Sequence, residues 1–87
     1  MRHEAMEAGR EARWLAPVWV RVGNGIPEVV RGPKDALEQL LFRWPSHQGR
    51  NYQTAKSKCM AALSKAGSPD EAREEFIRAS IEADMLD

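Results

Sequence analysis

The residues whose types are best suited to chemistry lie in one short stretch of the chain, from Arg43 to Tyr52. An aromatic side chain stands on each side of a polar loop that contains an imidazole, guanidiniums and amides. Such groups bind anions, nucleic-acid bases and protein partners. The candidate binding residues are Arg43, Trp44, His47, Arg50, Asn51 and Tyr52. A competing interpretation is that Trp44 and Tyr52 only fill the core at the two ends of a helix corner.

The same residue types do not predict catalysis. Ser46 and His47 are adjacent, which rarely brings a hydroxyl and an imidazole nitrogen into line, and no third group is identifiable to orient the ring. Cys59 is the only cysteine, and its neighbours on a helical stripe are Ala55 and Ala62, so we expect a buried structural thiol. A metal site would have to use His3, His47, Cys59 and carboxylates, and no two of His3, His47 and Cys59 stand at i and i+4 on one helix. We therefore expect no metal, no cofactor and no enzymatic activity.

Composition and charge predict one small folded domain. The 87 residues are 43% hydrophobic and 30% charged, with a formal net charge of zero. Disorder would need fewer apolar residues, and general attraction to nucleic acid or anionic lipid would need a positive net charge. No stretch approaches the roughly 20 apolar residues of a membrane span, and no secretory signal is recognisable, so we expect a cytoplasmic protein. Residues 1–13 predict a flexible N-terminal tail before a single domain at 14–87.

Two short strands are expected before residue 32. Apolar residues alternate over 18–22, which predicts a half-buried strand, and Asn24-Gly25 predicts a two-residue hairpin turn. The pairs that follow by counting outward from this turn are Arg21 with Glu28, Val20 with Val29, and Trp19 with Val30. This register places Val29 on the same face as the valines of the first strand.

Three helices follow, and each has a recognisable boundary. Pro33 suits the first position of a helix, and Pro45 ends that helix. A second helix is expected over 50–66, with Gly67 as the left-handed residue after its end. Ser68 is followed by proline and, three residues later, by glutamate, which is a strong N-cap signal for the third helix. The expected buried faces are Ala36, Leu37, Leu40, Leu41 and Trp44 in the first helix, Tyr52, Ala55, Cys59, Ala62, Leu63 and Ala66 in the second, and Ala72, Phe76, Ile77, Ala79, Ser80 and Ala83 in the third.

These elements predict an α+β fold in which an N-terminal two-stranded β-hairpin is covered on one face by three α-helices. The most distinctive features of the sequence are Arg31-Gly32-Pro33, Ala36-Leu37, Arg43-Trp44-Pro45, Gly49, Tyr52, Ala55, Cys59, Ala72-Arg73, Phe76-Ile77 and Ala79. On these features the chain resembles the "domain of unknown function 982" family of small rhizobial-type bacterial proteins, over about residues 19–83. The resemblance implies the same fold and brings no catalytic residues with it.

The function we expect is that of a non-enzymatic protein-interaction module, binding either another protein or a second copy of itself. A small hairpin domain leaves strand edges unpaired and gains stability by burying more surface. Trp14, Trp19 and Phe42 fall off the predicted core stripes and are the expected interface anchors. The alternative is a nucleic-acid or anion-binding regulator that uses the basic segment 43–65. Its candidate residues are Arg43, Arg50, Lys56 and Lys58, with Trp44 and Tyr52 as stacking surfaces.

The basic side chains of the second helix also have a structural explanation. Lys58 and Lys65 fall on nearly the same side of that helix. The acidic residues of the third helix that could face them across an antiparallel seam are Glu71, Glu75 and Glu82. The zero net charge favours this mutual neutralisation over nucleic-acid binding, and we expect no membrane partner.

Overall fold

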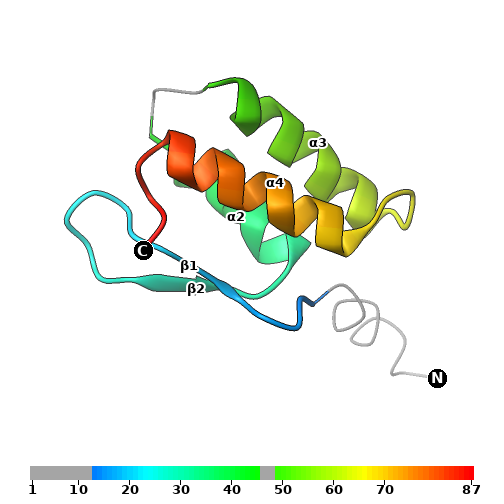
Figure 1. Ribbon diagram of the computed structural model, residues 1–87, viewed down its shortest axis with the longest axis horizontal. Helices are drawn as coiled ribbons and strands as arrows, with labels where there is room; N and C mark the ends of the chain where they lie inside the picture. Colours follow the sequence, from blue (N-terminus) through cyan, green and yellow to red (C-terminus); the bar gives the residue numbers. More distant parts are fainter. Residues whose placement is uncertain (1–12, 46–48) are drawn as a thin grey trace.

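The computed structural model describes residues 13–45 and 49–87, in which three helices cover one face of a hairpin (Figure 1). The hairpin consists of β1 (Val18–Val20) and β2 (Glu28–Val30), which run antiparallel. The helices are α2 (Pro33–Phe42), α3 (Arg50–Leu63) and α4 (Pro69–Glu82). The predicted α+β fold with its order of two strands and three helices is confirmed. The predicted tail, apart from its last residue, lies outside the described residues.

The predicted register of the hairpin is wrong by one residue. Val18 pairs with Val30, Trp19 with Val29, and Val20 with Glu28. The strands are joined by residues 21–27, a longer connection than the predicted two-residue turn. Its tight turn closes where the Gly25 N–H donates to the Val22 carbonyl at 3.0 Å, and Gly23 supplies the positive φ of 58°. A slip of one residue exchanges the two faces of a strand, so Val30 is fully buried instead of Val29.

The C-terminal residues explain the shift, because they bond to the other side of β1. The Arg21 N–H donates to the Met85 carbonyl at 2.8 Å, and the Asp87 N–H donates to the Trp19 carbonyl at 3.0 Å. Arg21 forms its ion pair with Asp87, at 3.0 Å, and not with Glu28 as the predicted register required. β1 is therefore covered on both sides, whereas among the described residues β2 pairs on one side only.

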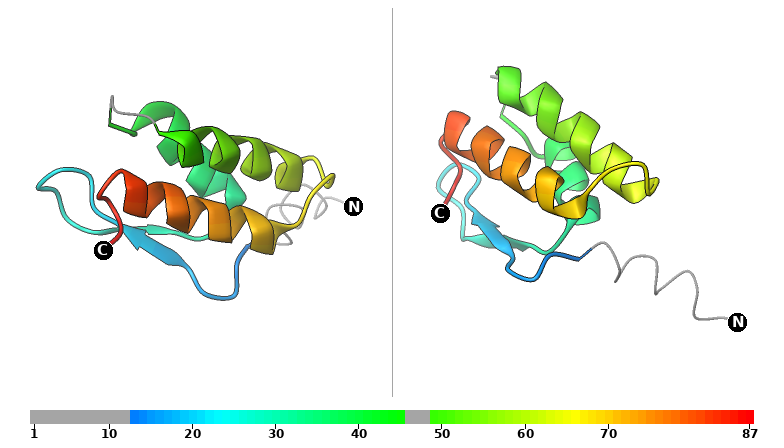
Figure 2. Two further views of the ribbon diagram at one scale, coloured as in Figure 1. Left: turned by 45° about the horizontal axis from the view of Figure 1, so that its top comes forward. Right: turned by 45° about the vertical axis from the view of Figure 1, so that its right-hand side comes forward.

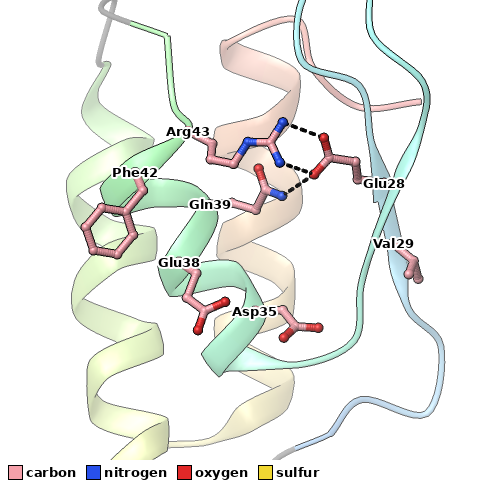
Figure 3. A pocket seen from close by; sticks show the side chains of 7 residues that line it. All are labelled: Glu28, Val29, Asp35, Glu38, Gln39, Phe42 and Arg43. Atoms are coloured by element: carbon pink, nitrogen blue, oxygen red, sulfur yellow. Dashed lines mark hydrogen bonds and ion pairs between the residues drawn. The ribbon is translucent and has the colours of Figure 1, made fainter.

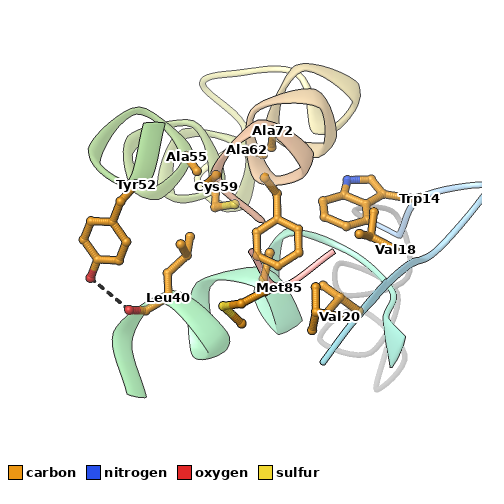
Figure 4. Packing of buried hydrophobic residues seen from close by; sticks show 14 residues of the cluster. Trp14, Val18, Val20, Leu40, Tyr52, Ala55, Cys59, Ala62, Ala72 and Met85 are labelled. Atoms are coloured by element: carbon orange, nitrogen blue, oxygen red, sulfur yellow. Dashed lines mark hydrogen bonds between the residues drawn. The ribbon is translucent and has the colours of Figure 1, made fainter. Parts of the chain in front are cut away.

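The core lies between the hairpin and the helices, which both views of Figure 2 place on one side of the strands. Its buried members are Trp14, Val18, Val20, Val30, Ala36, Leu40, Tyr52, Ala55, Cys59, Ala62, Ala72, Phe76, Ala79 and Met85 (Figure 4). Trp14 was expected to be an interface anchor, and that prediction is wrong. Its side chain is only 6% exposed, its ring lies 6.1 Å from that of Phe76, and its indole N–H donates to the Pro69 carbonyl.

The helix boundaries agree with the sequence at α4 and differ at α3. The Ser68 hydroxyl accepts hydrogen bonds from the N–H groups of Asp70 and Glu71, which confirms the predicted N-cap. α3 ends at Leu63, earlier than predicted, and its left-handed residue is Lys65 at φ 64°. Gly67 has a different role from the predicted one, because a Cβ atom there would lie 3.0 Å from the Ala61 Cβ.

The predicted buried faces are largely correct. α4 buries Ala72, Phe76, Ala79 and Ser80, and α3 buries Tyr52, Ala55, Cys59 and Ala62. Leu63, the last residue of α3, and Ala66, beyond its end, are exposed. Leu41 is also on the surface, with 49% of its area exposed, and Gln39 takes a buried place on α2 that the pattern of apolar residues did not indicate. None of the helices in the described part of the chain has the length and apolar run that crossing a membrane requires.

Candidate functional site

The predicted binding residues are divided among different parts of the structure. Tyr52 belongs to the core, since it is 5% exposed and its hydroxyl donates to the Leu40 carbonyl at 2.9 Å. Trp44 is half-buried, with its ring 6.1 Å from that of Tyr52 and 5.7 Å from that of Phe76. The two aromatic residues of the helix corner therefore pack on each other and on the core. His47 lies outside the described residues.

Asn51 and Arg50 begin α3, where a glutamate from another helix caps the chain. The Asn51 N–H donates to Glu82 Oε1 at 3.1 Å, and its side-chain amide donates to Oε2 of the same carboxylate at 3.4 Å. A negative charge is favourable at the N-terminus of a helix, where unpaired N–H groups converge. Gly49 makes this approach possible, because a Cβ at that position would collide with the Glu82 carboxylate. This part of the corner is a structural joint between α3 and α4.

Arg43 turns away from that joint and binds Glu28 on the hairpin. Arg43 Nη1 donates to Glu28 Oε1 at 2.8 Å, and Nη2 lies 2.6 Å from Oε2, so the guanidinium holds the carboxylate with two parallel contacts. Gln39 adds a third hydrogen bond, from Nε2 to Glu28 Oε1 at 2.9 Å. Bidentate pairs of this kind are stronger and more directional than single contacts. They tie α2 and the residue after it to β2 (Figure 3).

A groove of about 460 Å³ lies beside this contact, between β2 and α2. We call it the β2–α2 groove. Its lining consists of Glu28 and Val29 from β2, Asp35, Glu38, Gln39 and Phe42 from α2, and Arg43. The helical members recur at a spacing of three or four residues, which is the spacing that lines one face of a helix. The lining thus carries three carboxylates and one guanidinium, which leaves it acidic.

Gln39 is the least exposed polar residue of the groove. Its side chain is 8% exposed, and its Oε1 atom has no hydrogen-bond partner among the described residues. The amide cannot be turned over without loss of the bond from Nε2 to Glu28. A buried carbonyl oxygen without a donor costs about 1–3 kcal/mol of stability. The β2–α2 groove therefore contains an acceptor that the described part of the chain leaves unsatisfied.

The rim of the groove combines charge with an exposed ring. Phe42 is 78% exposed, at the C-terminal end of α2. Glu38 forms an exposed ion pair with Lys34 at 2.9 Å, and the hydrogen bond and charge of Glu38 raise the pKa of that lysine. Asp35 Oδ2 accepts a hydrogen bond from the Arg31 backbone N–H at 3.1 Å. The solvent side of the groove is thus open, acidic and partly apolar.

The backbone of β2 borders the groove with its free edge. The Trp19 carbonyl is directed to the C-terminal segment, so Trp19 and Val29 form a pair that is not hydrogen-bonded within the hairpin. It follows that Val29 directs its own N–H and C=O away from β1. Pro27 has no N–H, and the Arg31 N–H is bound by Asp35. Within 13–45 and 49–87, Val29 is therefore the residue of this edge whose N–H and C=O are both without a backbone partner.

The remaining candidates of the sequence have structural explanations. Cys59 is fully buried, and burial raises the pKa of its thiol from 9.0 to about 12. Lys58 forms an ion pair with Glu71 across the α3–α4 seam at 3.3 Å, as predicted, whereas Glu75 pairs with Arg78 on its own helix. No group of three or more His, Cys, Asp or Glu side chains within 13–45 and 49–87 could hold a metal ion.

Two residues of the groove were among those predicted from the sequence. Arg43 was one of the six candidate binding residues, and Phe42 was one of the expected interface anchors. Sequence reasoning missed Glu28 and Gln39, which are 11 positions apart in the chain and meet only through the tertiary fold. The available signal was weak: a glutamine on the buried face of an otherwise apolar helix. The contact between Glu28 and Arg43 was also missed, because the incorrect register paired Glu28 with Arg21.

The comparisons with known proteins add a family and no activity. A family model described as "Protein of unknown function (DUF982)" matches residues 16–86. Neither the search of curated proteins nor the search of solved structures found a match.

Proposed function

The chain belongs to the DUF982 family of proteins of unknown function, and we propose that it is a non-enzymatic protein-interaction module whose binding surface is the β2–α2 groove. The observation that supports this proposal is the convergence of three unused binding elements at one place. These elements are the free edge of β2 at Val29, the exposed ring of Phe42 and the unsatisfied oxygen of Gln39. Main-chain edges bind extended protein segments, and exposed aromatic rings anchor protein interfaces.

The acidic lining favours a protein partner over a nucleic acid. Three carboxylates against one guanidinium repel phosphate groups at the groove. The alternative function through the basic segment 43–65 loses two of its elements. Tyr52 is buried, and Arg43 is occupied by Glu28. Lys56 lies over the buried Tyr52 ring, 5.5 Å from its centre, so no specific contact favours base stacking. A reducing cytoplasm, the expected location, would suit the free thiol of Cys59.

Site-specific photo-crosslinking in living cells tests this function. A photoreactive phenylalanine analogue replaces Phe42 in one variant and Glu74 in a control, because Glu74 is exposed on α4 and outside the groove. We expect one defined protein adduct at position 42 and none at position 74, with the partner identified by mass spectrometry. An adduct between two copies of the chain would make the module a homodimer. Equal adducts at both positions, or none at position 42, would contradict the proposal.

A further inference from the structure

Resting on the function above, we propose that the β2–α2 groove binds an extended segment of a partner protein in which basic and apolar side chains alternate. The segment adds to the free edge of β2 as an antiparallel strand. Its lysine or arginine side chains point toward α2, and its apolar side chain points to the opposite face. Four features of the groove lead to this assignment: its charge, its unsatisfied acceptor, its strand edge and its outer apolar face.

The charge of the lining selects a basic occupant. Arg43 is already neutralised by the two contacts to Glu28. Asp35 and Glu38 remain, and within the described residues the ion pair that Glu38 forms is with the exposed Lys34. A lysine or arginine of the incoming segment supplies the missing positive charge. A second copy of this chain, docked groove to groove, would instead bring carboxylates against carboxylates, which costs association.

The unsatisfied acceptor selects an occupant with N–H donors. Gln39 Oε1 is buried and has no hydrogen-bond partner in the described part of the chain, while Nε2 is held on Glu28. Ammonium and guanidinium groups carry several N–H donors and accept nothing, so they fit an oxygen beside carboxylates. An N–H donor of the segment that reaches Gln39 Oε1 would therefore satisfy this acceptor. An acidic or purely apolar segment would leave this oxygen unpaired.

The strand edge fixes how the segment lies. Val29 directs both its N–H and its C=O outward, between Pro27 and the Arg31 N–H that Asp35 occupies. In an antiparallel pair one partner residue satisfies both groups of a single residue, whereas in a parallel pair two residues are needed. The accessible edge is one residue long, so the antiparallel arrangement fits it. The hydrogen bonding is short, and side-chain contacts must supply most of the specificity.

The pleat of the strand then determines which side chains of the segment point toward α2 and which point away from it. The residue opposite Val29 shares its face with Val29 and the half-exposed Trp19, on the side of the sheet away from α2. Figure 3 shows the Val29 side chain directed away from the groove. The residues on either side of that position turn toward α2, where the carboxylates lie. The segment that fits best therefore has an apolar residue between two basic ones.

Fluorescence anisotropy with labelled peptides tests this assignment on the intact chain. The probe is Thr-Arg-Val-Lys-Thr, and the controls are Thr-Glu-Val-Glu-Thr, the permuted Thr-Arg-Lys-Val-Thr, and the probe N-methylated at its central valine. We expect measurable binding of the probe that weakens with salt, and at least about tenfold weaker binding of each control. N-methylation removes a strand hydrogen bond without any change to the protein, so misfolding cannot explain its effect.

Variants of the protein locate the binding in the groove. Glu38→Gln should weaken binding of the probe about fivefold, because it removes one carboxylate from the lining. Glu74→Gln changes the net charge equally on an exposed site of α4 and should leave binding within about twofold. Equal effects of the two substitutions, or equal binding of acidic and basic peptides, would overturn the inference. So would displacement of the probe by a small diamine together with insensitivity to N-methylation.

The two proposals can fail separately. A defined crosslinked partner at position 42 without any preference for basic peptides would leave the protein-binding function intact and refute the basic strand. Absence of the crosslinked partner as well would refute both.

Discussion

At the scale of single residues, Gln39 is where stability and binding compete. The polar side chain occupies a buried position on α2 and leaves Oε1 without a partner in the described chain. An apolar side chain of similar length would pack equally well at this position. In the proposal for the β2–α2 groove, the side-chain oxygen of this glutamine is satisfied when a partner is bound.

Gln39→Met should therefore leave the folded chain as stable as before or more stable. The substitution removes the unsatisfied oxygen, while Glu28 keeps its two contacts to Arg43. We expect the free energy of unfolding in urea to stay equal or to rise by up to about 1 kcal/mol. Gln53→Met, at an exposed site of α3, is the control. A loss of more than about 2 kcal/mol would show that Gln39 is satisfied in the free protein.

Cys59 should make the free energy of unfolding decrease at alkaline pH. Burial raises the pKa of this thiol from 9.0 to about 12. Above pH 9 the unfolded chain releases the thiol proton and the folded chain does not, so stability present below pH 9 is lost as the pH rises toward 12. Between about pH 8 and about pH 10.5 the loss attributable to this thiol should be about 2 kcal/mol.

The measurement is the difference in unfolding free energy between the native chain and Cys59→Ala, determined by urea titration at both pH values. The contributions of all other ionisable side chains are common to both proteins and cancel in this difference. Cys59→Ala should cost stability at pH 8 because it leaves a cavity, and the cost should shrink as the pH rises. A difference that is the same at both pH values would contradict the assignment.

At the scale of elements, the N-termini of α3 and α4 are capped in different ways, one by a residue of another helix and one by a neighbouring residue. α4 is capped locally by Ser68, whose hydroxyl accepts two N–H groups at 3.1 and 3.2 Å. Ser68→Ala should lower the free energy of unfolding by about 1 kcal/mol. Ser57→Ala, at an exposed interior position of α3, should be neutral or slightly stabilising, because alanine has the higher helix propensity. Equal effects in thermal unfolding would argue against the cap.

α3 depends instead on Glu82 from α4. Glu82→Gln keeps hydrogen-bonding capacity and removes the negative charge beside the Asn51 N–H, so we expect a loss of about 0.5–1 kcal/mol that diminishes with salt. Glu74→Gln provides the matched control on the same helix. A salt-independent loss, or a loss equal to that of the control, would show that the charge of Glu82 does not stabilise the start of α3.

Local signals were sufficient to predict the elements themselves. The starts of α2 at Pro33 and of α4 after Ser68 were correct because these signals act through neighbouring residues, whereas α2 ends at Phe42, before the predicted end at Pro45. The hairpin register was not predictable from its turn, since β1 also bonds to residues 85–87, which are far away in the sequence. The end of α3 was misplaced because a lysine, Lys65, adopts the left-handed conformation that glycine usually takes.

The candidate site was less predictable than the fold. The sequence placed the candidate site at the corner between α2 and α3, where polar and aromatic residues are frequent. In the structure, Tyr52 completes the core and Asn51 completes a helix cap. The β2–α2 groove arises from Glu28, Gln39 and Arg43, which meet only when the hairpin packs against α2. Residues that meet in this way leave no periodic pattern in the sequence, so the groove is recognisable only in the folded chain.

At the scale of the whole molecule, zero net charge conceals an uneven distribution. The lining of the groove is acidic, whereas α3 carries Arg50, Lys56 and Lys58. The sheet is asymmetric as well: β1 is bonded on both sides, and β2 is the edge that borders the acidic groove. Open edges are usually protected against unwanted pairing. Here Pro27 and the Asp35 bond to Arg31 leave one short opening, which favours a specific partner over indiscriminate strand addition.

Nuclear magnetic resonance of the ¹⁵N-labelled chain, titrated with Thr-Arg-Val-Lys-Thr, shows residue by residue whether the peptide binds in the β2–α2 groove. The Val29 amide and the Gln39 side-chain amide report on the strand edge and on the unsatisfied acceptor at the same time. We expect the largest chemical-shift changes at these two groups and along the groove-facing side of α2. Largest changes at Arg50, Lys56 and Lys58, or changes spread evenly over the surface, would contradict this expectation.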